Sequence, residues 1–405
     1  MDMSGTKTYP SVIAQLSADD RAPGKRLRHD GPPMHGIKKI WKRLPSQVQQ
    51  AILKACCTLL STRRDGHTRG DGPVYVVGSL CSATGIGEGA RLYLGNLRGQ
   101  GIQACGVDAT SAMLQQAVLP PNADDGLALS NLPSRTGGGT VILHANPPLF
   151  QMVLLRMNRN FLRGKRLVAY WAWELECLPE IYLDALPYVD AVEVPSEFTA
   201  NAFRRVTDKD VRVVPHKLPE PVRRKTDFCT DGVMRCLYVF DMASSCERKN
   251  PWAAIAAFAT AFPDGRDAAL TLKASQRQAA PQTYQRLLAL AEATPGVTLL
   301  TDDLSASALD DLYLSHDVYL STHRSEGYGL TIHEAMLRGL HVAATGWSAN
   351  MEFMKGPLAH PLPYTLVPVP AGQMPACREA IRWAEVDVQG AAEVLRGLRT
   401  TLCQG

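Results

Sequence analysis

Two glutamates, Glu326 and Glu334, bracket a glycine-rich turn in the sequence SEGYGLTIHEAM, residues 325–336. The turn follows an apolar run at 317–321, whose β-branched and aromatic residues predict a buried strand. It precedes a helical pattern over 330–340. A turn between a strand end and a helix start is where an open α/β sheet binds ligands, and the free N–H groups of the helix favour an anion. The segment therefore predicts a site for an anionic group with a sugar hydroxyl beside it.

The glycines of this turn let the backbone come close to a ligand. Glu326 stands at the mouth of the turn. Glu334 falls about one and a half turns into the helix, near enough to the mouth to reach a hydroxyl. The candidate binding set of this segment is Gly327, Tyr328, Gly329, Leu330 and Glu334.

A second cluster carries positive charge. Arg248 and Lys249 open a predicted helix after the strand 236–241, so two cations and a helix amino terminus converge at one sheet edge. A diphosphate is the natural occupant of such a place. Basic residues at a helix amino end are otherwise unfavourable, which favours a binding role over a solvated helix start. Lys273, at the end of the strand LTLKAS, is a candidate for a second phosphate contact.

Polar residues also follow strands in the first half of the chain. His144 ends the strand TVILHAN, although a lone histidine is more often structural. Glu174 and Glu176 follow another strand and are candidates for binding acceptor hydroxyls. Trp173 is a candidate for stacking on a sugar face, while the competing interpretation is that the local tryptophans are core residues.

Strands and helices alternate from residue 73 onward, which predicts parallel, doubly wound sheets. The first series of strands is VYVVGS, IQACGVD, TVILHAN, RLVAYWAW and AVEVPS. A break rich in proline and charge follows at 215–234. The second series is RCLYVFD, AALTLKAS, VTLLTD, DVYLST, HVAAT and TLVPV. Two such halves joined by a linker predict two domains with a cleft between them.

Several of these segments together resemble a family. Glu326-x7-Glu334 with its glycine turn is similar to the signature of retaining glycosyltransferases of the GT-B fold, the large family-4 group. The resemblance extends, in order, over roughly residues 73–400, which makes it more specific than any one motif. Its further segments are TGIGEGAR at 84–91, YWAWELECLPE at 170–180, VDAVEVPSEFTANAFR at 189–204 and YVFDMASSCERKNPWAAIAAFATAFP at 238–263.

The resemblance implies an α/β protein with the GT-B fold, two Rossmann-like doubly wound domains facing across a cleft. It implies that Glu326 contacts the hydroxyls of a donor sugar and that His144 lies near the transferred sugar. Lys249 would hold the diphosphate, while Gly85 and Gly87 would face the donor phosphates. It also implies transfer with retention, in which the departing diphosphate takes the acceptor proton. Cations and a helix dipole then replace a metal, so no metal and no cofactor are expected.

The chain departs from the family pattern at one point. Many relatives have a glycine-arginine pair several residues before the lysine, and here 241–245 lacks that arginine. The sequence RKNP at 248–251 resembles a subset of bacterial members that act in surface polysaccharide or lipopolysaccharide assembly. The donor implied is GDP-mannose or a UDP-sugar, and the acceptor is a glycan or lipid-linked glycan.

Two alternatives remain open. Gly85-x-Gly87-x-x-Ala90 formally satisfies a dinucleotide fingerprint, with Asp108 at the end of the next strand, as in an NAD(P)-dependent oxidoreductase. The longer loop at 79–84 fits this fingerprint poorly. The chain is alternatively a catalytically inactive, glycosyltransferase-like binding protein. A glycosidase pair is rejected for Glu326 and Glu334, because no further carboxylate is placed across a scissile bond.

Composition permits this interpretation. A chain of 405 residues is usually two domains. It contains no apolar run long enough for a spanning helix and no apparent signal peptide. The ten cysteines are scattered and form no C-x-x-C, which favours a reduced, cytoplasmic setting over a disulfide scaffold or a zinc site.

Positive charge is concentrated at the amino end, where residues 1–70 hold 13 Lys and Arg against 5 Asp and Glu. The body is therefore slightly acidic, which disfavours a nucleic-acid partner. The first 35 residues predict disorder. Residues 37–60 predict amphipathic helix, and the basic cluster 38–43 beside Trp41 suits an anionic membrane surface. The predicted organisation is an extension 1–70, an acceptor-side domain 71–220, a nucleotide-sugar domain 221–375, and a helix within 376–405 that crosses back to the first domain.

Overall fold

The computed structural model describes residues 41, 44–66, 68, 70–119, 127–133, 136–375 and 377–403. The predictions of a disordered amino-terminal tail and of the basic cluster 38–43 beside Trp41 lie outside these residues, except for Trp41 itself. The described residues from Gln50 onward form one compact unit, and those before Gln50 are not part of it. No helix among the described residues is both long and apolar enough to cross a membrane.

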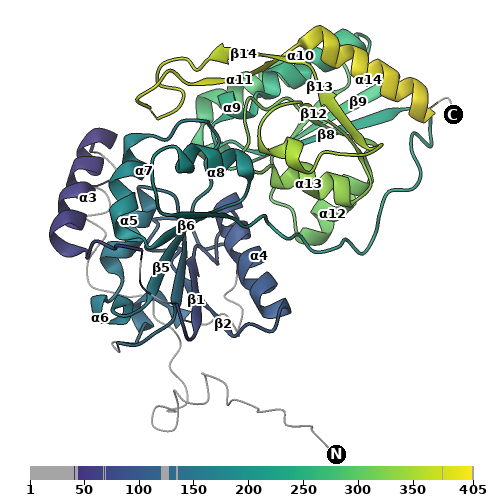
Figure 1. Cartoon of the computed structure of the whole chain (residues 1–405). Coiled ribbons are helices and arrows are strands. Elements are labelled where there is room, and N and C mark those ends of the chain that lie inside the picture. The colour runs from purple at the N-terminus through teal and green to yellow at the C-terminus, as the bar shows by residue number, and fades with distance from the viewer. Residues whose placement is uncertain are drawn as a thin grey trace, which may run out of the picture. The chain divides into compact units, whose positions relative to one another are not determined.

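The first domain is built on a seven-stranded parallel sheet of order β3-β2-β1-β4-β5-β6-β7 (Figure 1). Its strands are β1 (Val74–Gly78), β2 (Ala104–Asp108), β3 (Leu127–Ala128), β4 (Thr140–His144), β5 (Arg166–Tyr170), β6 (Ala191–Val194) and β7 (Asp210–Val213). Its helices are α4 (Gly85–Gly99), α5 (Leu149–Arg156), α6 (Arg159–Leu162), α7 (Glu180–Ala185) and α8 (Glu197–Arg204), with 3₁₀ turns η1 (Leu129–Asn131) and η2 (Leu186–Tyr188). The central strands are near-continuous apolar runs because helices cover both faces of such a sheet.

The second domain repeats the design with a six-stranded parallel sheet of order β10-β9-β8-β11-β12-β13. Its strands are β8 (Met234–Asp241), β9 (Ala268–Ser275), β10 (Val297–Leu300), β11 (Val318–Ser321), β12 (His341–Thr345) and β13 (Ala359–Leu362). Its helices are α9 (Cys246–Lys249), α10 (Pro251–Ala261), α11 (Pro281–Glu292), α12 (Ala306–Leu314), α13 (Leu330–Leu337) and α14 (Val388–Cys403), with η3 (Arg277–Ala279) and η4 (Ala349–Glu352). Each sheet is the centre of its own large hydrophobic core. The predicted break at 215–234 contains no helix or strand up to residue 233.

The carboxyl-terminal part differs from the prediction in two ways. TLVPV does not join the second sheet, because β14 (Tyr364–Pro368) pairs antiparallel with β15 (Arg382–Val386) in a separate hairpin. The helix predicted from residue 376 begins only at Val388. It packs along α10 and buries Leu395 and Leu398 in the core of the second domain (Figure 1). The prediction that this helix braces the first domain is therefore wrong.

The hairpin makes the contacts that the helix was expected to make. Trp383 of β15 is buried in the core of the first domain. Beyond β14, Cys377 forms an antiparallel bridge with Pro179, and the guanidinium of Arg378 binds the carboxylate of Glu180. The segment between β14 and β15 thus ties the second domain to the first through side chains and backbone.

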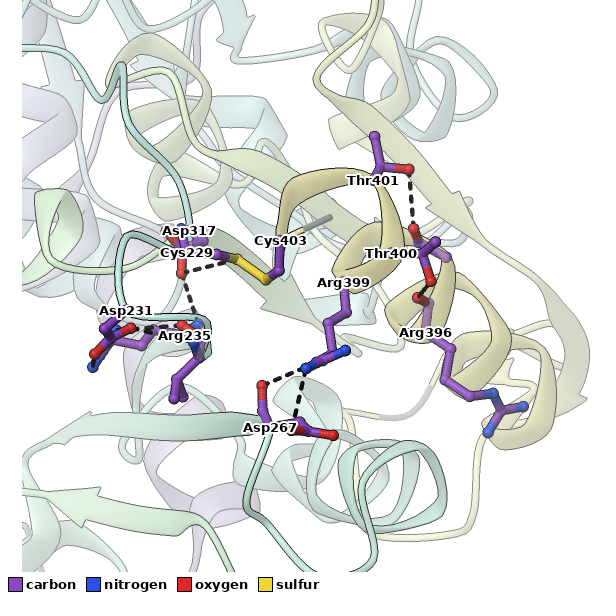
Figure 2. Close-up of a disulfide and its surroundings, with 12 residues drawn as sticks. Cys229, Asp231, Arg235, Asp267, Asp317, Arg396, Arg399, Thr400, Thr401 and Cys403 are labelled. Atoms are coloured by element: carbon purple, nitrogen blue, oxygen red, sulfur yellow. Dashed lines mark hydrogen bonds and ion pairs between the residues drawn. A yellow bond between two sulfur atoms is a disulfide. The ribbon is translucent and has the colours of Figure 1, made fainter. Parts of the chain in front are cut away.

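Two cysteines pair across the second domain. Cys229, just before β8, forms a disulfide with Cys403 at the end of α14, with a Cα–Cα distance of 5.1 Å (Figure 2). The backbone N–H of Cys229 also donates to the buried carboxylate of Asp317. A disulfide that closes a long loop removes about 5 kcal/mol of unfolded-state entropy in the chain-entropy description. The sequence favoured a reduced setting over a disulfide scaffold and did not indicate this pair, because these residues lie far apart in sequence and meet only when α14 folds back.

Helix α3 (Ser46–Leu60) precedes β1, and two of its residues, Leu53 and Cys57, are buried. Several of its other apolar side chains are exposed. Leu59 keeps 81% of its surface and Ile52 keeps 39%. This helix therefore presents apolar side chains outward as well as inward.

Candidate functional site

The centre of the candidate site is the carboxylate of Glu326, just beyond β11. Its Oε1 accepts a hydrogen bond from Nζ of Lys249 and lies 3.3 Å from Nη1 of Arg248. The three side chains are only 10%, 14% and 3% exposed, respectively. The sequence prediction that the glycine turn and the basic pair meet at one edge of the second sheet agrees with this geometry.

The environment keeps Glu326 ionised. Burial alone would raise the pKa of this carboxyl group, but Lys249, Arg248 and His323 outweigh burial and lower it to about 2. An ionised carboxylate only accepts hydrogen bonds, which suits it to orienting hydroxyl groups. The backbone N–H of Glu326 is fixed by Oγ of Ser348 at 2.9 Å.

Arg248 is committed to contacts within the protein. Its guanidinium donates to the carbonyl of Ser325 at 2.6 Å and to Oγ of Ser244 at 2.8 Å. It also lies 3.4 Å from the carboxylate of Glu174 in the first domain. Arg248 therefore positions the turn that carries Glu326 and leaves Lys249 as the more available cation.

The basic pair does not open a helix as predicted. Arg248 and Lys249 end the one-turn helix α9, and Asn250 then adopts a left-handed conformation (φ 52°) before Pro251 begins α10. The side chain of Asn250 caps α10 by accepting from N–H of Ala253. The prediction missed this break because an Asn–Pro step ends one helix and starts the next.

The glycine turn is shaped by the first domain. A Cβ at Gly327 would lie 2.9 Å from the carbonyl oxygen of Trp173. The carbonyl of Gly327 accepts from Oγ of Ser196 at 2.8 Å and from Oγ1 of Thr199 at 3.4 Å. Gly329 (φ 92°) is the left-handed residue before α13, which Leu330 begins. The close approach predicted toward a ligand is therefore, at Gly327, an approach to protein backbone.

Tyr328 does not face a ligand either. It is buried, and its hydroxyl donates to the carbonyl of His216 at 2.9 Å and lies 2.9 Å from Nδ1 of His333. The predicted donor contact of Tyr328 is corrected to a contact between the domains. Tyr328 was predicted to bind the donor because it lies in the glycine-rich turn, and the sequence does not show that the turn packs against the first domain.

Glu334 lies on α13 and accepts from the hydroxyl of Tyr313 at 2.9 Å. Burial raises the pKa of its carboxyl group, Glu88 adds to this, and the contacts with Tyr313 and Arg338 oppose it. A ligand hydroxyl that binds the carboxylate of Glu334 would therefore have to displace the hydroxyl of Tyr313 or bind beside it.

Lys273 is buried in β9, and its Nζ donates weakly to the carbonyl of Ala274 at 3.4 Å. Burial lowers the pKa of this amine, while Asp303 and Asp302 oppose the shift. Among the described residues, no carboxylate lies within 4 Å of its Nζ. Lys273 therefore remains a candidate phosphate contact, set further along the sheet edge than Lys249.

His144 lies at the carboxyl end of β4 and is 1% exposed. Its ring stacks on Tyr170 with centroids 4.2 Å apart and meets Tyr93 edge-on at 4.8 Å. Burial and the neighbouring His216 hold its pKa well below the usual value. Its Nε2 is buried without a hydrogen-bond partner, which is unusual for a polar atom in a protein core.

The residues predicted to bind the acceptor lie in different environments. Trp173 is buried, with its indole N–H donating to the carbonyl of Cys177 at 2.9 Å, so the predicted stacking on a sugar is wrong and the core interpretation is right. The carboxylate of Glu174 faces Arg248, and its carbonyl accepts from Oγ of Ser325. Glu176 is exposed. Glu174 therefore links the two domains, and Glu176 alone keeps a free carboxylate position for an acceptor.

The glycines of α4 have different environments. Gly85 is exposed with open space around it, whereas a Cβ at Gly87 would lie 2.6 Å from the carbonyl of Ser79. Gly87 is thus a packing glycine, and only Gly85 remains available to a ligand. The carboxylate of Asp108 accepts from the hydroxyl of Thr110 at 2.5 Å and from N–H of Cys81 at 3.3 Å. Asp108 therefore fixes the loop after β1, which counts against its use as a ribose ligand.

Sequence reasoning missed His323, which follows β11 directly. Its Nδ1 lies 3.0 Å from Oγ of Ser321, and its Nε2 lies 3.0 Å from Oδ1 of Asn350. Burial lowers its pKa to about 4, although Glu326 opposes the shift. The polar run after β11 was the available signal. No group of three or more His, Cys, Asp or Glu side chains suited to a metal occurs within the described part of the chain.

No family model matches the sequence, and no curated protein matches it. Solved structures do match the fold. A glycosyltransferase from Rickettsia africae aligns at a TM-score of 0.54 with 12% identity, over 82% of this chain and 92% of the other. Anabaena HepE in complex with UDP and glucose aligns at 0.51 with 14% identity, over 82% and 95%. An E. coli trehalose-6-phosphate protein bound with UDP-2-fluoro glucose aligns at 0.52 with 11% identity, over 82% and 95%.

The chain has the GT-B fold. Against longer chains the match is partial, since it covers 50% of the pneumococcal O-GlcNAc transferase GtfA and 48% of S. aureus TarM, each at a TM-score of 0.43. Identities this low establish a shared fold, so the activity has to be argued from the residues of the site.

Proposed function

We propose that this protein is a retaining glycosyltransferase that transfers a sugar from a nucleoside diphosphate sugar to a glycan. The observation that carries the proposal is the buried contact of Lys249 and Arg248 with Glu326 at the carboxyl edge of the second sheet. That edge is where an open α/β sheet binds its ligand. A cation beside a carboxylate suits a ligand that has phosphate at one end and hydroxyls at the other.

Lys249 and Glu326 have complementary tasks in this proposal. When the donor binds, the ammonium of Lys249 contacts the diphosphate instead of Glu326. The carboxylate of Glu326 then accepts hydrogen bonds from the sugar hydroxyls. Because the carboxylate is ionised and the backbone N–H of Glu326 is held by Oγ of Ser348, it also stabilises positive charge that develops on the sugar ring. Arg248 stays with Ser325 and Ser244 and holds the turn in place.

The transfer itself exchanges one bond for another. The bond between the anomeric carbon and the diphosphate oxygen breaks, and a bond from the acceptor oxygen forms on the same face. The acceptor proton passes to the departing diphosphate, so the protein supplies no general base. Its residues position the partners and stabilise the charge of the leaving group. His144 would accept or donate one hydrogen bond at a hydroxyl of the transferred sugar through its unpaired Nε2.

The neighbours of this fold favour a uracil nucleotide. HepE is in complex with UDP and glucose, and the E. coli protein is bound with UDP-2-fluoro glucose. We therefore place UDP-sugars before GDP-mannose as donors. The remaining parts of the proposal are a glycan or lipid-linked glycan acceptor in bacterial surface polysaccharide assembly, no metal requirement, and a cytoplasmic position near an anionic membrane surface.

The test is a transfer reaction with the full chain. UDP-glucose, UDP-galactose and GDP-mannose are supplied with a mixture of glycan acceptors, with and without a chelator. Release of one nucleoside diphosphate, an α-linked product from an α-linked donor by NMR, and indifference to the chelator support the proposal. An inverted product would contradict retention. Binding of a nucleoside diphosphate without release, for every donor and acceptor, would favour the inactive binding protein.

A further inference from the structure

A cavity of about 630 Å³ lies in the first domain, away from Glu326. Its walls are the end of α3 with the segment that follows it, the end of α5, and the connection from α6 to β5. These segments lead into the amino ends of β1 and β5. The residues that meet the glycine turn, such as Trp173 and Ser196, follow the carboxyl ends of strands. The cavity and the candidate donor site therefore lie at opposite edges of the first sheet.

The cavity is basic. Five cationic side chains line it against a single carboxylate, that of Asp65. The cations are Arg63, Arg64, Arg159, Arg163 and Lys165. Such an excess around one concave site attracts an anion, and the volume falls in the range of ordinary small-ligand pockets.

Only one of these cations has a clear structural role, as a cap at the end of a helix. Arg64 pairs with Asp190 at 2.6 Å and donates to the carbonyls of Leu162 and Lys165, so it caps the end of α6. Among the described residues, no carboxylate lies within 4 Å of Arg63, Arg159 or Arg163, all of which are exposed. Within the described part of the chain, no ion pair uses their charge.

Lys165 is the strongest sign that the cavity is built for a ligand. It is only 4% exposed, and its ammonium donates to the carbonyl of Gly137 at 3.2 Å and stands 4.6 Å from the ring centre of Phe161. No carboxylate among the described residues neutralises it. A buried cation without a counter-ion is costly, and a ligand anion would remove that cost.

Apolar residues complete the wall. Leu60, Leu154 and Leu155 line the cavity, and Leu59, beside its rim, is 81% exposed. We propose that this cavity binds a phosphate group, either free or carried as the headgroup of a lipid. The exposed leucines beside the cations are the feature that a lipid would use.

The test compares two exposed arginines of the cavity with two elsewhere. The variants are Arg159→Glu with Arg163→Glu, and as control Arg266→Glu with Arg396→Glu, which change the net charge equally in the second domain. Both are made in the full chain carrying Lys249→Ala, so that the candidate donor site does not contribute. The probes are inorganic pyrophosphate by calorimetry, and phosphatidylcholine vesicles with or without phosphatidic acid by co-sedimentation. Thermal melts of all variants check that they fold.

Binding of either probe that falls at least tenfold in the cavity variant alone supports the proposal. Loss confined to the phosphatidic acid vesicles assigns the phosphate to a lipid, and loss confined to pyrophosphate assigns it to a soluble ligand. Equal binding by the cavity and control variants, or no binding of either probe by the parent chain, overturns the proposal.

Discussion

The carboxyl edges of the two sheets are built on the same plan and carry opposite chemistry. The edge of the second sheet gathers ionised side chains, with Glu326 against Lys249 and Arg248. The edge of the first sheet gathers neutral rings, with His144 stacked on Tyr170 and flanked by Tyr93. Burial suppresses charge at the first edge, whereas paired charges survive burial at the second.

This difference suggests a division of labour. A diphosphate needs charge and would bind at the second edge, while the first edge would offer the sugar shape and a hydrogen bond. The two domains contact each other at these edges. The hydroxyl of Tyr328 donates to the carbonyl of His216, and the guanidinium of Arg248 lies near the carboxylate of Glu174. The ionic edge of the second sheet is therefore braced by residues of the first domain.

The largest expected effect is on transfer in the variant Glu326→Gln. The amide keeps the size of the side chain but removes the negative charge, so we expect the rate to fall by about 10³-fold. Affinity for UDP should hold or rise, because Lys249 loses its internal partner. Steady-state kinetics and calorimetry on the same protein separate the two effects. A fall in UDP affinity with an unchanged transfer rate would contradict the assignment of Glu326 to the transferred sugar.

Acid should weaken both edges between pH 6.5 and 4. Burial lowers the pKa of His216 to about 4, with a contribution from His333, and burial lowers that of His323 to about 4 despite Glu326. The unfolded chain binds these protons first, so stability is full above pH 6.5 and is lost as pH falls toward 4. The expected loss is about 3 kcal/mol for each histidine.

Denaturant unfolding at a series of pH values measures this slope. The single variants His216→Gln and His323→Gln should each flatten it, one at the first edge and one at the second. Glu326 adds a separate loss between about pH 4.5 and 2, because its folded pKa is depressed. A slope that is the same in both variants and the parent would show that other groups govern acid unfolding.

A smaller effect is expected from His144→Phe. The new ring keeps the stacking on Tyr170 and removes the unpaired Nε2, so stability should hold or rise by about 1 kcal/mol. Transfer should fall roughly tenfold if one hydrogen bond to the sugar is lost, with UDP affinity unchanged. Unchanged transfer would mean that the first edge contributes packing only.

Sequence patterns predicted the central strands of both sheets because buried parallel strands are continuous apolar runs. The edge strands β3, β7 and β13 were not predicted. The patterns failed where tertiary contacts decide. TLVPV has strand character, but nothing local shows that it pairs with Arg382–Val386 outside the main sheet. The helical pattern from residue 376 contained that strand, since a short alternating segment also fits a helix period.

The site shows the same limit. Glu326 and Lys249 were found from their place after strands, which a sequence displays directly. The environments of Trp173, Tyr328 and Gly327 depend on the opposite domain, so local patterns gave ligand roles to residues that contact protein. The Cys229–Cys403 disulfide joins residues 174 positions apart and has no local signal.

The most direct test of the account is calorimetric titration of UDP, GDP and NAD into the parent chain and Lys249→Ala, with Lys355→Ala as an exposed-lysine control. We predict tight binding of one nucleoside diphosphate, indifferent to a chelator, that weakens about 10- to 100-fold in Lys249→Ala alone. Thermal melts check that the variant folds. We expect that it does, because Arg248 still faces the carboxylate of Glu326. Binding of NAD instead, or equal affinity for a nucleoside diphosphate in all three proteins, would contradict the placement of the donor at Lys249.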